Sequence, residues 1–170
     1  VRLCHEQGKR VIVATHLLES MIENPIPTRA EVTDVANAVY EEVDAIMLSG
    51  ETTVGKYPIK CIEYMDKISR TSERVPGLRF CNALVKDNNK QHLAYSAVQL
   101  AEDMEAQGIV VITRRGVMAN LVSNCRPSKT TIFAFTNDSR TRRQMNLNRA
   151  VVSHRLAFSS DPEKTLVAAF

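Results

Sequence analysis

The sequence lacks the features by which several classes of protein are recognised. No apolar run approaches the roughly 18 residues of a membrane-spanning helix, so we expect no association with a membrane. The first residues lead directly into the polar stretch Glu6–Arg10, so we expect no signal peptide. Basic residues are not interleaved with aromatic ones, and no nucleic-acid-binding motif is present, so we expect no nucleic-acid partner.

Closely spaced cysteines are also absent. The chain contains 4 cysteines that lie far apart and form no CxxC pair, namely Cys4, Cys61, Cys81 and Cys125. A zinc site needs closer spacing, and a secreted disulfide scaffold needs a denser set. We therefore expect reduced thiols and a cytoplasmic location. Hydrophobic residues make up 44% of the chain, which is enough for a packed core.

The first part of the chain alternates between strand and helix patterns. The β-branched run Val11–Thr15 predicts a buried strand. Thr28–Glu31 has the form of a capping box and predicts the start of a helix that runs to about Glu42. Ala45–Leu48 predicts a second strand, and Pro58 begins a helix that ends at Ser72. The spacing of about 34 residues between the strands is typical of a parallel α/β unit, and two such units cannot close a sheet alone.

A break at Val75–Gly77 and a polar stretch at Lys86–Lys90 separate this part from a second alternating segment. Basic residues outnumber acidic ones from Leu93 onward, which favours an anionic ligand there. The segment predicts helices at 95–107, 117–124 and 139–148, and strands at 109–112, 130–135 and 151–158. A last helix starts at Ser160–Glu163 shortly before the sequence ends, so we expect an incomplete second domain.

Three stretches carry more information than this α/β pattern. They are Val11–Ile22 (VIVATHLLESMI), Pro27–Val39 (PTRAEVTDVANAV) and Ile46–Thr52 (IMLSGET). In this order and spacing they closely resemble pyruvate kinase. The resemblance implies an enzyme of glycolysis that transfers phosphate from phosphoenolpyruvate to ADP and so gives pyruvate and ATP.

The resemblance also implies an α/β fold class with a specific domain organisation. Residues 1–75 would form the last two βα units of a TIM (β/α)8 barrel, and residues 76–92 an interdomain linker. Residues 93–170 would form a truncated three-layer α/β regulatory domain at the C-terminus.

The chemistry of such a barrel is expected at the C-terminal ends of its strands, where Thr15 and Ser49 lie. The resemblance implies that Thr15 and His16 bind substrate, and that Ser49 and Glu51 are catalytic. Each residue has a structural alternative. Thr15 is able to cap backbone at a strand end, and Ser49 is typical of a turn. Glu51 fits either an orienting carboxylate or a partner of a helix dipole. His16 departs from the glutamine that is usual in the family, and histidine is able to titrate near neutral pH.

In the second segment, the family's effector loop corresponds to Thr113, Arg114, Arg115 and Gly116. The resemblance implies that this loop binds a phosphorylated effector. Val117 stands where the family has a hydroxyl. The two arginines are able to bind phosphate through forked hydrogen bonds, and they equally fit solvated surface charge.

The resemblance implies Mg²⁺ and K⁺ as cofactors of the intact enzyme, and ADP/ATP, phosphoenolpyruvate and a homo-oligomer, a tetramer, as partners. We identify no ligands for either ion in this sequence, and the family's catalytic lysine is also missing from it. We therefore expect the chain alone to be inactive. The alternative is a non-catalytic module of the same family that binds an effector or a partner.

Overall fold

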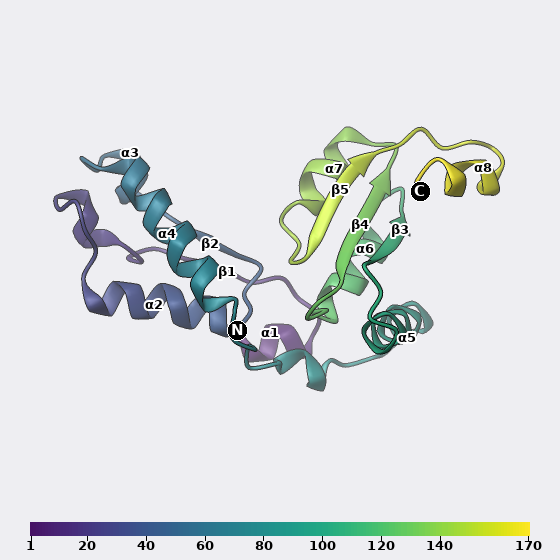
Figure 1. The fold of residues 1–170 in the computed structure, drawn as a ribbon, viewed down its shortest axis with the longest axis horizontal. Helices are drawn as coiled ribbons and strands as arrows, with labels where there is room; N and C mark the ends of the chain where they lie inside the picture. The colour runs from purple at the N-terminus through teal and green to yellow at the C-terminus, as the bar shows by residue number, and fades with distance from the viewer. The chain divides into compact units, whose positions relative to one another are not determined.

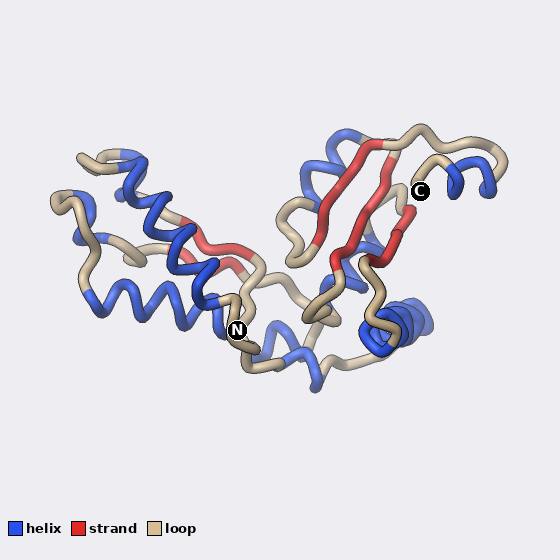
Figure 2. Tube along the Cα trace, viewed as in Figure 1, coloured by secondary structure: helices blue, strands red, loops and turns tan.

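The computed structural model describes residues 1–170 and divides into two compact units. Unit 1 comprises residues 1–2 and 11–80, and unit 2 comprises residues 3–10 and 81–170 (Figure 1). Both contain parallel strands with helices packed against them, as the colouring in Figure 2 shows. The predicted α/β fold is therefore confirmed.

Unit 1 is built on two short parallel strands. Strand β1 (Ile12–Ala14) pairs with β2 (Ala45–Met47), with Val13 opposite Ile46. The remaining elements are η1 (Glu19–Ile22), α2 (Arg29–Tyr40), α3 (Gly50–Thr53) and α4 (Pro58–Ser72). Helices α2 and α4 pack against each other. The buried core of the unit consists of Leu17, Leu18, Met21, Val35, Cys61 and Ile68.

The two long helices of unit 1 begin where the sequence predicts. Thr28 caps α2, because its side chain accepts a hydrogen bond from the backbone N–H of Glu31, and the Glu31 side chain bonds back to the N–H of Thr28. Pro58 is the first residue of α4. Proline has no backbone N–H, and at this position an N–H would make no hydrogen bond within the helix. The two short helices, η1 and α3, were not predicted, since four residues are too few to show a helical period.

Unit 2 contains a three-stranded parallel sheet in the order β3-β4-β5. The strands are β3 (Gly108–Ile112), β4 (Thr131–Thr136) and β5 (Val151–Arg155). The helices are α5 (Asn89–Asp103), α6 (Val117–Asn124), α7 (Ser139–Met145) and α8 (Pro162–Val167), together with α1 (Arg2–Glu6) and η2 (Phe80–Ala83), of which only the first residue falls in unit 1. Along β4 buried and half-buried residues alternate, so one face of the sheet carries the core with α5, α6 and α7. This core includes Val98, Val111, Ala119, Val122, Ile132, Ala134 and Met145.

The compact units are bounded differently from the predicted domains, and the assignment of residues to barrel, linker and regulatory domain stays a prediction. The prediction assigned residues 1–75 to the first domain, whereas residues 3–10 pack with unit 2. His5 is buried there with its Nε2 at 3.1 Å from Arg126 Nη2, and the Asn124 side-chain amide donates to the carbonyl of Gly8 at 2.8 Å. These contacts join segments more than one hundred residues apart, so no local pattern indicates them.

The predicted linker over residues 76–92 contains regular structure at both ends. Helix η2 occupies Phe80–Ala83, and α5 begins at Asn89 rather than at Tyr95. Asn88 caps α5, since its side chain accepts a hydrogen bond from the Gln91 N–H at 2.9 Å. The polar run that suggests a linker therefore supplies the helix start. None of the helices in either unit has both the length and the apolar character needed to span a membrane.

Candidate functional site

A pocket of about 230 Å³ lies in unit 1 where the chain leaves β1 and β2. All four residues predicted for the active site line it, namely Thr15, His16, Ser49 and Glu51. Glu19, Ile22 and Gly50 complete the lining. The residues after β1 and after β2 meet because parallel strands bring their carboxyl ends to the same edge of a sheet. Their binding and catalytic roles stay predictions.

The turn that follows β1 has an unusual backbone. Thr15 has a φ of 69° and His16 a φ of 54°, so two successive residues with side chains adopt the left-handed region. A β-branched residue in this region is a genuine outlier that costs about 1–3 kcal/mol, and such strain is concentrated at functional sites. The Thr15 hydroxyl donates to the carbonyl of Ala14 at 2.6 Å. His16 Nδ1 lies 2.5 Å from Glu19 Oε2, and both side chains are largely exposed.

Glu51 lines the pocket and is only 2% exposed. One carboxylate oxygen accepts a hydrogen bond from the Leu18 N–H at 3.1 Å, and the other accepts from the Ser49 N–H at 2.8 Å. Burial by itself raises the pKa of Glu51. The backbone N–H groups of Glu51, Ser49 and Leu18, together with the charge of His16, outweigh burial and lower the pKa below its usual range. The site therefore holds a carboxylate whose oxygens are both engaged by backbone.

Glu31 is a second buried carboxylate of unit 1, and it lies outside the lining of this pocket. Its oxygens accept hydrogen bonds from the Ser20 N–H at 2.6 Å and the Ser20 hydroxyl at 2.5 Å, in addition to those from Thr28. Burial raises its pKa, but the bonds from Ser20 and Thr28 lower it overall. Glu31 thus connects η1 to the start of α2. The capping-box pattern gives its place in the sequence but not its bond to Ser20.

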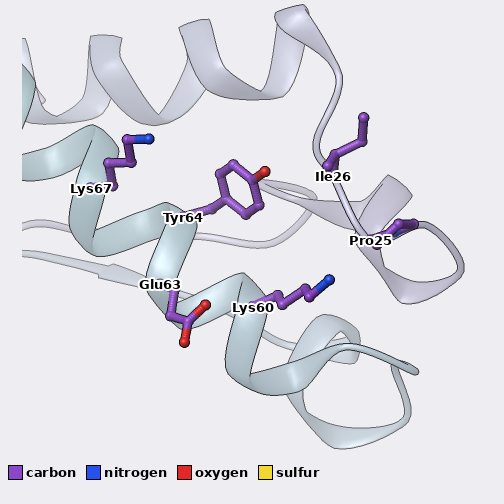
Figure 3. Close-up of a pocket in the computed structure, with 6 residues that line it drawn as sticks. All are labelled: Pro25, Ile26, Lys60, Glu63, Tyr64 and Lys67. Carbon is purple, nitrogen blue, oxygen red and sulfur yellow. The ribbon is translucent and has the colours of Figure 1, made fainter.

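A second pocket in unit 1, of about 280 Å³, lies between α4 and the loop before α2 (Figure 3). Figure 3 shows Tyr64 projecting from α4 toward Ile26, while Glu63 points away from the loop. Lys60, Glu63 and Lys67 are exposed, so the charged groups of this pocket lie in solvent. No sequence pattern indicated this depression, and it contains no buried polar group that would hold a ligand.

In unit 2, part of the predicted effector loop lines a pocket of about 480 Å³. Thr113 and Arg114 contribute to the lining, whereas Arg115 and Gly116 do not. Gly116 instead has a φ of 75° directly before α6, which explains the need for glycine at this position. The opposite wall comes from the chain after β5 and was missed by sequence reasoning. It consists of Phe158, Ser159, Pro162, Glu163, Thr165 and Leu166.

The residues present do not fit a divalent cation. No group of three or more His, Cys, Asp or Glu side chains is placed to hold a metal ion. The two carboxylates that line the pocket of unit 1 are already engaged, Glu51 by backbone N–H groups and Glu19 by His16. We therefore derive no step through Mg²⁺ or K⁺ from this chain.

Two parallel α/β units, with polar residues gathered where the strands of the first unit end, place the chain in the class of α/β proteins. Comparison with known protein families gives two matches: residues 1–62 match the barrel domain of pyruvate kinase, and residues 91–170 match the alpha/beta domain of pyruvate kinase. The chain belongs to the pyruvate kinase family.

Individual relatives agree with this result. The chain is 43% identical to pyruvate kinase isozyme G, chloroplastic, of Ricinus communis over 97% of its length, and 35% identical to a pyruvate kinase of Clostridium perfringens over 98%. It covers 40% and 36% of these relatives.

Among solved structures, a pyruvate kinase from Cryptosporidium parvum superposes with a TM-score of 0.89 at 36% identity, covering 98% of this chain and 35% of the other. A pyruvate kinase from Pyrobaculum aerophilum superposes with a TM-score of 0.90 at 28% identity, covering 99% and 39%.

Proposed function

We propose that the chain is the C-terminal part of a pyruvate kinase that transfers phosphate from phosphoenolpyruvate to ADP. In this proposal residues 1–75 form the last two βα units of the barrel, and residues 93–170 belong to the regulatory domain. One observation carries the proposal. Two segments more than thirty residues apart, Thr15–His16 and Ser49–Glu51, line a single pocket where parallel strands end.

The two hydroxyls of the pocket have separate roles in this proposal. Thr15 donates a hydrogen bond to the carboxylate of phosphoenolpyruvate or holds a water, which requires its proton to turn away from the carbonyl of Ala14. Ser49 contributes a hydroxyl to the hydrogen-bond network beside the enolate. Mg²⁺ and K⁺ would neutralise the charge that develops during phosphoryl transfer, and residues outside this chain would bind them.

Regulation is proposed for the pocket of unit 2. Thr113 and Arg114 offer a hydroxyl and a guanidinium to a phosphorylated effector, in an intact enzyme that forms a homotetramer. The other wall carries one carboxylate, which would repel a second phosphate, together with two hydroxyl side chains and three apolar ones: Glu163, Ser159, Thr165, Phe158, Pro162 and Leu166. A ligand with a single phosphate and an apolar portion suits this lining better than a bisphosphate does. The cytoplasmic location stays a prediction, and the relative from Ricinus communis is named as chloroplastic.

The test is a coupled assay of pyruvate formation from phosphoenolpyruvate and ADP with magnesium and potassium. The intact protein is expected to turn over, and the 170-residue chain alone is expected to give none. A folded intact protein without activity would reject the enzyme and favour a binding module of the same family. Turnover by the purified 170-residue chain, absent from a Thr15→Ala preparation, would show that the chain needs no further catalytic residues.

A further inference from the structure

The pocket of unit 1 depends on a connection between two separate turns. The turn after β1 contains Thr15 and His16 and runs on to Leu18, and the turn after β2 contains Ser49. Leu18 and Ser49 both donate their backbone N–H to Glu51. A single buried carboxylate, which itself lines the pocket, therefore joins the two turns.

The backbone held in this way is not one that the sequence would adopt unaided. Thr15 and His16 both have positive φ, a region that residues with side chains rarely adopt. Strained backbone persists only where the surrounding structure fixes it. Two further connections between these segments lie farther along the chain: the Lys56 N–H donates to the carbonyl of Ile22 at 2.8 Å, and the Lys56 ammonium donates to the Glu23 carboxylate.

The hydrogen bonds of Glu51 also show what it does not do. Each carboxylate oxygen accepts from a backbone N–H, and the negative charge is favoured by these donors although the side chain is buried. A general acid or base needs an oxygen that reaches the substrate and a proton that it exchanges near the working pH. Glu51 has a lowered pKa, and both of its carboxylate oxygens accept hydrogen bonds from backbone N–H groups. These features fit a residue that anchors the two turns.

We propose that Glu51 is a positioning residue, which sets the Ser49 hydroxyl and the Thr15–His16 turn in the one arrangement that the reaction requires. In this proposal the positioning role takes the place of the catalytic role that the sequence analysis gave to Glu51. The effect on turnover rests on the proposed function, whereas the anchoring of the two backbone N–H groups does not.

The substitution Glu51→Gln tests this role with little change of volume. A glutamine offers one acceptor oxygen and one NH₂ group, so it is able to accept from only one of the two N–H donors. The matched control is Glu31→Gln, because Glu31 is also buried, also has a lowered pKa and also accepts backbone N–H bonds, but it holds Ser20 and Thr28 outside the pocket lining.

In the intact protein, Glu51→Gln should lower kcat by about 10- to 100-fold, the loss expected of a misplaced reacting group. Glu31→Gln should change kcat by less than about threefold, as substitutions remote from the chemistry usually do. The pH profile of kcat should keep its shape in Glu51→Gln. Hydrogen exchange followed by NMR should show faster exchange of the Leu18 or Ser49 amide in this variant and no such change in Glu31→Gln.

Three results would overturn the proposal. The first is a Glu51→Gln variant with wild-type kcat, and the second is unchanged protection of both amides. The third is loss of one limb of the pH profile with the amides still protected, which would make Glu51 an acid or base. If the wild-type protein forms no pyruvate, the proposed function is wrong, and the amide exchange still decides whether Glu51 anchors the two turns.

Discussion

Replacing Thr15 by glycine separates the energetic role of this residue from its proposed chemical role. Thr15 has a φ of 69°, which a β-branched residue adopts only under strain, and its hydroxyl donates to the carbonyl of Ala14. Glycine adopts positive φ without strain but loses the hydroxyl. Alanine loses the hydroxyl and keeps a Cβ in the left-handed region. The pair therefore distinguishes backbone strain from hydrogen bonding.

The magnitudes follow from three terms. Glycine relieves strain of about 1–3 kcal/mol, loses an exposed hydrogen bond worth about 0.5–1.5 kcal/mol, and adds about 0.5–1 kcal/mol of entropy cost on folding. The free energy of unfolding of Thr15→Gly should therefore stay within about 2 kcal/mol of wild type, and it should be at least equal to that of Thr15→Ala. Both variants should lower kcat/KM by about ten- to a hundredfold, because a charged substrate loses one hydrogen bond.

The assay combines urea unfolding with steady-state kinetics of the intact protein. Thr15→Ser should be milder because it keeps the hydroxyl. Thr33→Ala is the matched control, since Thr33 is exposed on α2 and its hydroxyl likewise donates to a backbone carbonyl, that of Arg29 at 3.0 Å. If Thr15→Ala and Thr15→Ser both match wild-type kinetics, Thr15 is only structural. If Thr15→Gly is clearly less stable than Thr15→Ala, the strain argument is wrong.

Three further predictions concern regulation, the loop before α6 and acid stability. At sub-saturating phosphoenolpyruvate, the intact enzyme should respond weakly or not at all to fructose bisphosphate, and strong activation at micromolar concentration would contradict this. The response to another phosphorylated effector should be weakened by Arg114→Ala but not by Arg115→Ala. Gly116→Ala should lower the free energy of unfolding by about 1–2 kcal/mol, because alanine resists a φ of 75°, and an unchanged melting temperature would refute it. The pKa values of Glu31 and Glu51 are lower in the folded state than in the unfolded state. The stability that these residues contribute is therefore fully present above the unfolded-state pKa of about 4.3, and it is lost as the pH falls through the folded-state pKa values. Equal urea midpoints at neutral and strongly acidic pH would argue against this.

The sequence predicted those features of unit 1 that depend on neighbouring residues. Thr28 and Glu31 are three positions apart, so their capping box is readable from the sequence. The bond from Glu31 to Ser20 is not, because it depends on how the chain folds back between the two residues. Helix α3 is too short to show a period. The positive φ of Thr15 opposes the local preference of threonine, so only the packed structure reveals it.

In unit 2, the sequence located the loop of the candidate effector site but not its complete lining. Thr113–Gly116 follows a strand and precedes a helix, which is a local pattern. Arg114 lines the pocket and Arg115 does not, a difference that the spacing of the two neighbouring residues does not indicate. Phe158 and Glu163 follow β4 and β5 along the chain, so they are distant from Thr113 in the sequence. They line the same pocket as Thr113, which no spacing in the sequence indicates.

The pairing of residues 3–10 with residues 81–170 has a consequence for synthesis on the ribosome. Residues 3–10 are made before residues 11–80, yet the rest of the unit to which they belong, residues 81–170, is made only after residues 11–80. At about 5–20 residues per second, this delay amounts to several seconds, during which helix α1 has none of its later partners. Bringing the two segments together also closes a loop of roughly 70 residues, at an entropic cost of about 4 kcal/mol if that loop is still unfolded. Prior folding of residues 11–80 would bring the ends of this segment closer together and lower that cost. Helix α1 is thus made before residues 11–80 but packs only after residues 81–170 have been made.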